Sequence, residues 1–265
     1  LFHGYVEHLV HNEHWVQADA NRVRNSILAT LNALGAPDEV GSTAGLVVAP
    51  VQGGKTSHFN GVTLLGLDAG YHRILVLGGH NNDLRSQTQD RLESVVQRLE
   101  AARSRPRFVT GHDVNGDLRA GVAFNPDYPG TQILVIKKNS RTLENFADAY
   151  GDTSRPLLIV DDEADWGTQN TNPDGEDPTT LNRLIASIIQ SAPGRGRRAY
   201  VAYTATPYAN LLVSKRDQGA IDIDFVRLVR PGRGYLGQEH LLGGEDGEPA
   251  LPIYQGRKRK DSSPA

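Results

Sequence analysis

The chain has 265 residues, a formal net charge of −3, 38% hydrophobic and 22% charged residues, and no cysteine. This length and composition predict a large globular domain whose core needs no cross-links, and the missing cysteines exclude disulfides and cysteine-ligated zinc. No apolar run approaches the ~20 residues that span a bilayer, and no secretory signal opens the chain, so a cytoplasmic protein without a membrane partner is expected. Because it starts at leucine and contains no methionine, we expect it to be a piece of a longer protein.

The first predicted element is a helix from about residue 16 to residue 34, which ends before Gly35 and Pro37. Short apolar, β-branched runs then alternate with longer helical patterns. The runs are typical of strands buried on both faces of a sheet, and they cover residues 46–49, 74–77, 133–136, 157–160 and 199–202. The helices expected between them span about 55–67, 82–103, 140–150 and 179–191. This alternation predicts an α/β fold with a mostly parallel sheet and helices on both faces.

The strongest local motif is APVQGGKT at residues 49–56, between a predicted strand and a predicted helix. Glycines let the backbone turn tightly enough for consecutive amides to point at phosphates. Lys55 would reach the β- and γ-phosphates, and the Thr56 hydroxyl would ligate Mg²⁺. The first glycine of the usual pattern is replaced by Ala49, and a glycine turn with a coincidental lysine is the alternative. The expected nucleotide-binding residues are Gln52, Gly53, Gly54, Lys55, Thr56 and Ser57.

Four carboxylates in five positions follow the fourth predicted strand, namely Asp161, Asp162, Glu163 and Asp165. Because the carboxyl ends of parallel strands meet at one edge of a sheet, these groups are expected to face the phosphate loop. Asp162 would hold Mg²⁺, and Glu163 would orient and deprotonate the attacking water. Together with Lys55 they form the expected catalytic set. A solvated acidic turn is the alternative.

A third motif, TATP at residues 204–207, follows the last predicted strand. The ordered set APVQGGKT, VDDEAD and YTATP resembles motifs I, II and III of superfamily-two helicases, and residues 162–165 spell DEAD. The fragments VQGGKT, HNNDLRSQTQ, IVDDEADWGTQNTN and YTATPYANLL are similar to the signatures of the Z-one domain family, a helicase-like group described as endonucleases from bacterial restriction and defence loci. The resemblance covers roughly residues 44 to 240.

The resemblance implies a RecA-like P-loop ATPase lobe that binds ATP and Mg²⁺. It also implies a role in a bacterial defence or restriction protein that acts on nucleic acid, with DNA expected rather than RNA. It implies that Asp165, Thr204 and Thr206 couple hydrolysis to movement. The expected domains are a helical segment at 1–40, the RecA-like domain at 41–230, and a Gly/Pro-rich, basic extension at 231–265. About 60 residues after the third motif cannot supply a second RecA-like lobe with its arginine finger, so that lobe is expected in a longer chain or another subunit.

Polar side chains that follow two further strands are candidates for contact with a nucleic-acid backbone. They are Asn81 and Arg85 after the second predicted strand, and Lys137 and Lys138 after the third. Helix capping and solvated charge are the alternatives. Two other functions stay open: a nucleotide-gated switch that never translocates, and the ATPase part of an endonuclease whose cleavage centre lies elsewhere.

Overall fold

A computed structural model of the protein describes residues 1–50, 53–99, 106–111, 116–119, 125, 128–164, 180–190, 194–206 and 221–232. The helices are α1 (Phe2–His11), α2 (Gln17–Leu34), α3 (Lys55–Ala69), α4 (Asn82–Arg98), α5 (Ser140–Tyr150) and α6 (Thr180–Ile189). The strands are β1 (Ser42–Val48), β2 (Arg73–Leu77), β3 (Arg107–Phe108), β4 (Gln132–Ile136), β5 (Leu157–Asp161), β6 (Arg198–Thr204) and β7 (Phe225–Leu228). Within the described residues, no helix is long and apolar enough to cross a membrane.

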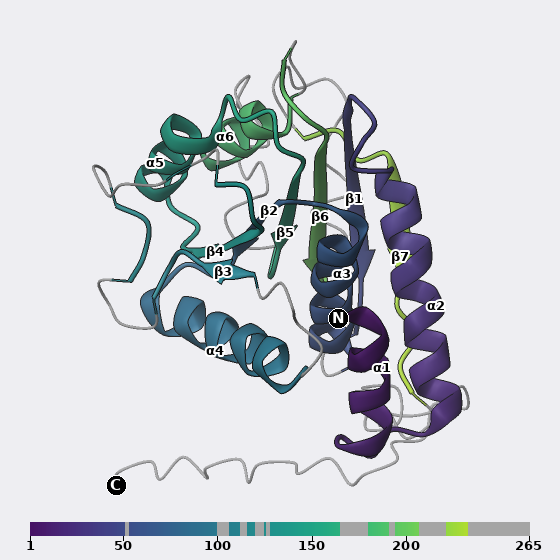
Figure 1. The fold of residues 1–265 in the computed structure, drawn as a ribbon. Helices are drawn as coiled ribbons and strands as arrows, with labels where there is room; N and C mark the ends of the chain where they lie inside the picture. Colours follow the sequence, from purple (N-terminus) through teal and green to yellow (C-terminus); the bar gives the residue numbers. More distant parts are fainter. Residues whose placement is uncertain are drawn as a thin grey trace, which may run out of the picture.

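The strands form one sheet in the order β3-β4-β2-β5-β6-β1-β7, and every described pairing is parallel (Figure 1). The predicted RecA-like α/β class is therefore confirmed. All five predicted strands and five predicted helices are present, although α4 ends at Arg98 rather than near residue 103. The sequence interpretation missed α1 and the strands β3 and β7. The two strands have only two and four residues, too few for a periodic pattern to be recognised.

Each face of the sheet has its own core. Helices α1 to α4 cover one face, and α5 and α6 cover the other (Figure 1). Along β2, Ile74 and Val76 join the first core, whereas Leu75 and Leu77 join the second. Both sets are fully buried, which explains why the strands have continuous apolar sequences instead of an alternating pattern.

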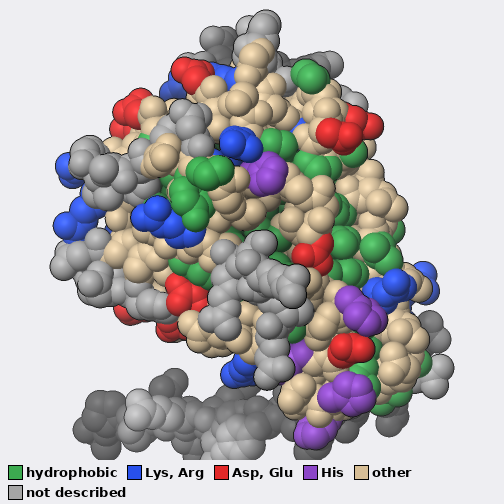
Figure 2. All heavy atoms as spheres, in the orientation of Figure 1, with side chains coloured by type: hydrophobic (Ala, Val, Ile, Leu, Met, Phe, Trp, Pro, Cys, Tyr) green, Lys and Arg blue, Asp and Glu red, His purple; other side chains and the backbone are tan. Residues whose placement is uncertain are grey.

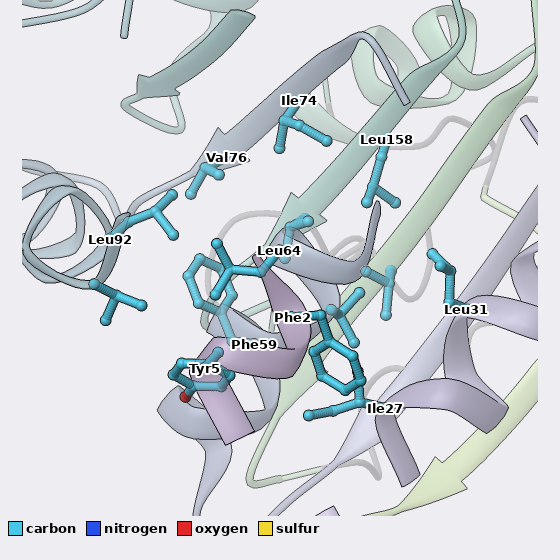
Figure 3. Close-up of a cluster of buried hydrophobic side chains, with 14 of the residues drawn as sticks. Phe2, Tyr5, Ile27, Leu31, Phe59, Leu64, Ile74, Val76, Leu92 and Leu158 are labelled. Carbon is cyan, nitrogen blue, oxygen red and sulfur yellow. The ribbon is translucent and has the colours of Figure 1, made fainter. Parts of the chain in front are cut away.

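The N-terminal helices belong to the core of this domain. Phe2 and Tyr5 of α1 and Ile27 of α2 pack around Phe59 of α3 (Figure 3). A Cβ atom at Gly61 of α3 would lie 2.3 Å from Ile27 Cδ1, so glycine permits the close approach of α2 to α3. Helix α3, which follows the glycine loop, is thereby held between the sheet and the N-terminal segment.

Candidate nucleotide-binding site

The loop after β1 and the acidic turn after β5 lie at the same edge of the sheet. Strand β6 separates β1 from β5, and all three run in the same direction, so their carboxyl ends lie side by side. The amide of Ala49 donates to the carbonyl of Thr204 at 3.0 Å, and the amide of Ala164 donates to that of Tyr203 at 2.9 Å. The end of β6 is thus bonded to both motifs, and the two motifs lie at the ends of the strands on either side of it.

Two glycines shape the phosphate loop. The Gly53 amide donates to the Pro50 carbonyl at 2.8 Å, and a Cβ atom at Gly53 would lie only 2.9 Å from the same oxygen. Gly54 has a φ of 92°, in the left-handed region that disfavours side chains, and it precedes the first residue of α3. Tight turns of this kind leave the first amides of a helix open to an anion. Gln52 lies outside the described residues.

The side chains of the loop and the acidic turn meet. Lys55 Nζ lies 3.0 Å from Asp162 Oδ1, and the two side chains are 23% and 24% exposed. Thr56 is exposed and Ser57 is half-buried, both in the first turn of α3. The ammonium and the helix N-terminus suit the phosphates of a magnesium nucleotide, and the hydroxyl and carboxylate oxygens suit its metal ion. The residues present therefore fit a magnesium-bound phosphate chain, for which Thr56 and Asp162 would be the oxygen ligands.

The acidic turn has an unusual backbone. Glu163 has a φ of 55°, although a residue with a side chain loses about 1–3 kcal/mol in such a conformation. The amide of Asp162 is bonded to the Leu77 carbonyl of β2 at 3.1 Å, which fixes the start of the turn. Asp162 and Glu163 line a small cavity of about 30 Å³ together with Gly78 and with Arg91 of α4. The expected base is thus next to the end of β2 and to α4.

Asp161, the last residue of β5, has a role that the sequence interpretation missed. Its Oδ1 lies 2.7 Å from Lys138 Nζ, and the two side chains are 0% and 1% exposed. Its Oδ2 accepts a hydrogen bond from the Tyr200 hydroxyl at 2.8 Å. Burial, followed by the charge of Asp161, raises the pKa of Tyr200 well above its usual value, so the phenol keeps its proton. A carboxylate that is buried at the end of an apolar strand needs a cationic partner. This need is the signal in the sequence that could have indicated Lys138.

The coupling residues are only partly described. Thr204 is buried, and its hydroxyl oxygen accepts a hydrogen bond from the Thr206 amide at 2.9 Å. Asp165 lies outside the described residues. The described link between the acidic turn and β6 is the main-chain bond from Ala164 to Tyr203. Coupling through these threonines stays a prediction.

Two of the four side chains expected to contact nucleic acid, Arg85 and Lys138, are buried in this structure. Arg85 is 0% exposed and donates to the Gly111 carbonyl at 2.8 Å, because it lies on the face of α4 that packs toward the sheet. Lys138 is buried against Asp161. Asn81 is exposed, whereas Lys137 is half-buried and lies 3.7 Å from Asp117.

Asn81 caps α4, since its Oδ1 accepts a hydrogen bond from the Leu84 amide at 2.8 Å. We expect Asn81→Ala to lower the free energy of unfolding by about 1 kcal/mol, as loss of a helix cap does. Asn81→Ser should retain most of that stability because serine also caps. Denaturant unfolding of the two variants measures this difference, and an equal loss in both would contradict a capping role.

His58 connects three elements behind the loop. Its Nε2 lies 3.0 Å from the Ser26 hydroxyl of α2, and its Nδ1 lies 3.0 Å from the Tyr203 hydroxyl of β6. Burial lowers its pKa to about 4, so the ring is neutral near pH 7. Tyr5 of α1 donates to the Ser57 carbonyl at 2.9 Å, next to this histidine. The N-terminal helices therefore hold the first turns of α3, a role that no sequence pattern indicated.

Histidines and carboxylates also lie together on the surface near α1 (Figure 2). His3 is 3.4 Å from Glu7, and His8 is 3.6 Å from Glu13. Across the described part of the chain, no group of three or more such residues could hold a metal ion. His3, Glu7 and Glu13 are exposed, whereas the His8 side chain is only 9% exposed.

No family model and no curated protein matches the chain. Among solved structures it is similar to the helicase domain of Hef from Pyrococcus furiosus, with 17% identity, a TM-score of 0.44, and coverage of 76% of this chain and 37% of that one. It is also similar to a DEAD box protein from the hyperthermophile Methanococcus jannaschii, with 19% identity, a TM-score of 0.45, and coverage of 80% and 53%. The chain thus spans about a third of the first structure and about half of the second.

Proposed function

We propose that the chain is the nucleotide-binding lobe of a helicase-like P-loop ATPase that acts on nucleic acid. The observation that carries this proposal is the 3.0 Å contact between Lys55 Nζ and Asp162 Oδ1, which joins the loop after β1 to the turn after β5. Neither motif alone distinguishes a nucleotide site from a glycine turn or an acidic surface turn. Their contact, beside an open helix N-terminus, supports one site for a phosphate chain and its counterion.

In the proposed site, the residues of the chain have separate roles in binding and hydrolysis. The first amides of α3 bind the phosphates, and Lys55 exchanges Asp162 for the β- and γ-phosphate oxygens. Thr56 and Asp162 hold Mg²⁺, which supplies positive charge against the phosphates when it is bound. Glu163 orients the attacking water and accepts its proton. An arginine from a second RecA-like lobe, in the same longer chain or another subunit, completes the site.

A thermal shift tests the nucleotide site. With Mg²⁺ and a slowly hydrolysed ATP analogue at 100 times its dissociation constant, binding adds about 2.7 kcal/mol of stability, or roughly 5–10 °C for a domain of this size. Lys55→Ala should lose most of this shift, because its ammonium is the main contact with the outer phosphates. Lys137→Ala is the matched control and should keep the shift, because Lys137 is a half-buried lysine after β4 with an exposure close to that of Lys55. Equal shifts in the parent and the Lys55→Ala chain would overturn the assignment.

DNA as the substrate and a bacterial restriction or defence setting form the finer part of the proposal, supported by the resemblance of VQGGKT and IVDDEADWGTQNTN to the Z-one domain family. Turnover by the chain together with its second lobe should rise with single-stranded DNA more than with RNA of the same length. A nucleotide-gated switch would show no stimulation by either strand. If the ATPase serves an endonuclease centre elsewhere, the Glu163→Gln protein should still nick DNA.

A further inference from the structure

We infer that Lys138 is a positioning residue that holds Glu163 in its working orientation through the Glu163 carbonyl; the catalytic half of this inference rests on the proposed function. Lys138 Nζ donates to the Glu163 carbonyl oxygen at 2.6 Å while it lies 2.7 Å from Asp161 Oδ1. One buried ammonium therefore contacts the acidic turn at two residues, Asp161 and Glu163, which flank Asp162. The lysine comes from the end of β4 and the turn from the end of β5, so the contact spans β2, which lies between them.

The turn needs this contact because its backbone does not favour its own conformation. A left-handed φ at a residue with a side chain persists only where the surroundings determine it. Two main-chain bonds fix the neighbours of Glu163, from Asp162 to Leu77 and from Ala164 to Tyr203. Lys138 supplies the described contact to the carbonyl of Glu163 itself. Without it, the Glu163 peptide could turn, and the carboxylate would leave the edge of the sheet where Asp162 meets Lys55.

The Lys138 ammonium also neutralises the buried charge in the cluster of carboxylates. Asp161 is fully buried directly beside Asp162, and an unpaired charge there would be costly. Lys138 and the Tyr200 hydroxyl each take one oxygen of Asp161. Asp162 is thereby left to pair with Lys55 at the surface of the site. Removing the charges of Lys138 and Asp161 together separates two possible roles of Lys138. If Lys138 only neutralises Asp161, the turn at Glu163 should be unaffected, whereas loss of a positioning contact should loosen it.

The test is a pair of neutral double variants. Lys138→Met with Asp161→Asn removes both charges and the described donor to the Glu163 carbonyl, while the asparagine keeps an acceptor for Tyr200. Lys138→Gln with Asp161→Asn is equally neutral but retains a donor. Arg73→Met is the matched control, because Arg73 is a buried cation whose guanidinium donates to main-chain carbonyls, including that of Tyr128 at 2.6 Å, at the opposite end of β2.

The first readout needs no nucleotide. Hydrogen exchange of the Asp162 and Ala164 amides should become about 10-fold faster or more in the methionine double variant, because opening of the turn releases both. Exchange should be closer to the parent rate in the glutamine double variant and unchanged by Arg73→Met. If the methionine variant does not fold, Lys138→Arg takes its place, since the larger planar guanidinium places its donors away from the position of the ammonium nitrogen. Parent-like exchange in the turn, or equal acceleration in the control, would overturn the inference.

The second readout uses turnover. Misplacing the base should lower kcat about 10- to 100-fold and change the dissociation constant of the magnesium ATP analogue little, because the loop and Lys55 are untouched. In a Glu163→Gln background the methionine double variant should have no further effect on kcat. A parent chain that binds no nucleotide, with faster exchange in the variant, would sink the proposed function and leave the positioning role intact. Nucleotide binding with an unchanged kcat would contradict the inference that Lys138 affects turnover by positioning Glu163.

Discussion

Glu163→Gln should lower the single-turnover rate of ATP hydrolysis by about 10²–10⁴-fold, the range expected when a general base is removed. Glutamine has nearly the same shape but cannot accept the proton of the attacking water. The dissociation constant of the ATP analogue should change little, since the loop, Lys55 and Asp162 keep their contacts. Rapid quench measures the rate, and isothermal calorimetry measures the affinity.

The matched control is Glu144→Gln, the same change at an exposed residue of α5 on the other face of the sheet. Its turnover should equal that of the parent. Unimpaired hydrolysis by the Glu163→Gln chain would show that another group orients the water. A parallel loss of affinity and rate would instead place Glu163 among the binding residues.

The folded chain should lose about 3 kcal/mol of stability as the pH falls from 7 to 4, through His58 alone. Burial lowers the pKa of this histidine from 6.5 to about 4, so the unfolded chain takes up the proton first. The neutral His58 ring costs the folded chain little stability above pH 6.5. The free energy of unfolding then falls between pH 6.5 and pH 4, and it levels off once the folded ring also binds a proton. The ring is held between Ser26 and Tyr203, and Arg227 of β7 adds a smaller effect that disfavours a charged imidazole.

Denaturant unfolding of the nucleotide-free chain at several pH values measures this loss. His58→Gln removes the titrating group, so the difference between the two pH profiles isolates the histidine from the carboxylates that titrate over the same range. The parent profile should be steeper by about one proton in the middle of the window. Parallel profiles would mean that the ring is accessible to protons in the folded chain.

The candidate site shows how far reasoning from residues reaches. The loop at Gly53 to Thr56 and the carboxylates after β5 were found because each motif directly follows an apolar strand, and parallel strands bring their carboxyl ends to one edge. The nearness of the two motifs was expected on that basis, whereas the direct contact between Lys55 and Asp162 was not. What those groups do in catalysis remains a proposal, for which the contact is support.

Local pattern was a poor guide to which charged side chains are buried. Arg85 and Lys138 stand in polar stretches after strands, where solvent exposure is the usual outcome. Their burial depends on acceptors distant in the sequence, the Gly111 carbonyl for Arg85 and Asp161 with the Glu163 carbonyl for Lys138. Such pairings are set by the order of strands in the sheet, and that order cannot be deduced from the chain order of the motifs.

By itself, the sequence determined the α/β class, the succession of strands and helices, and the loop and acidic turn that flank the site. These follow from local periodicity and from the residues that tight turns require. Only the tertiary structure decided that α1 and α2 hold the first turns of α3, and that Lys138 holds the turn at Glu163. The physical reason is that a buried polar contact becomes favourable only when packing brings both partners together and excludes water.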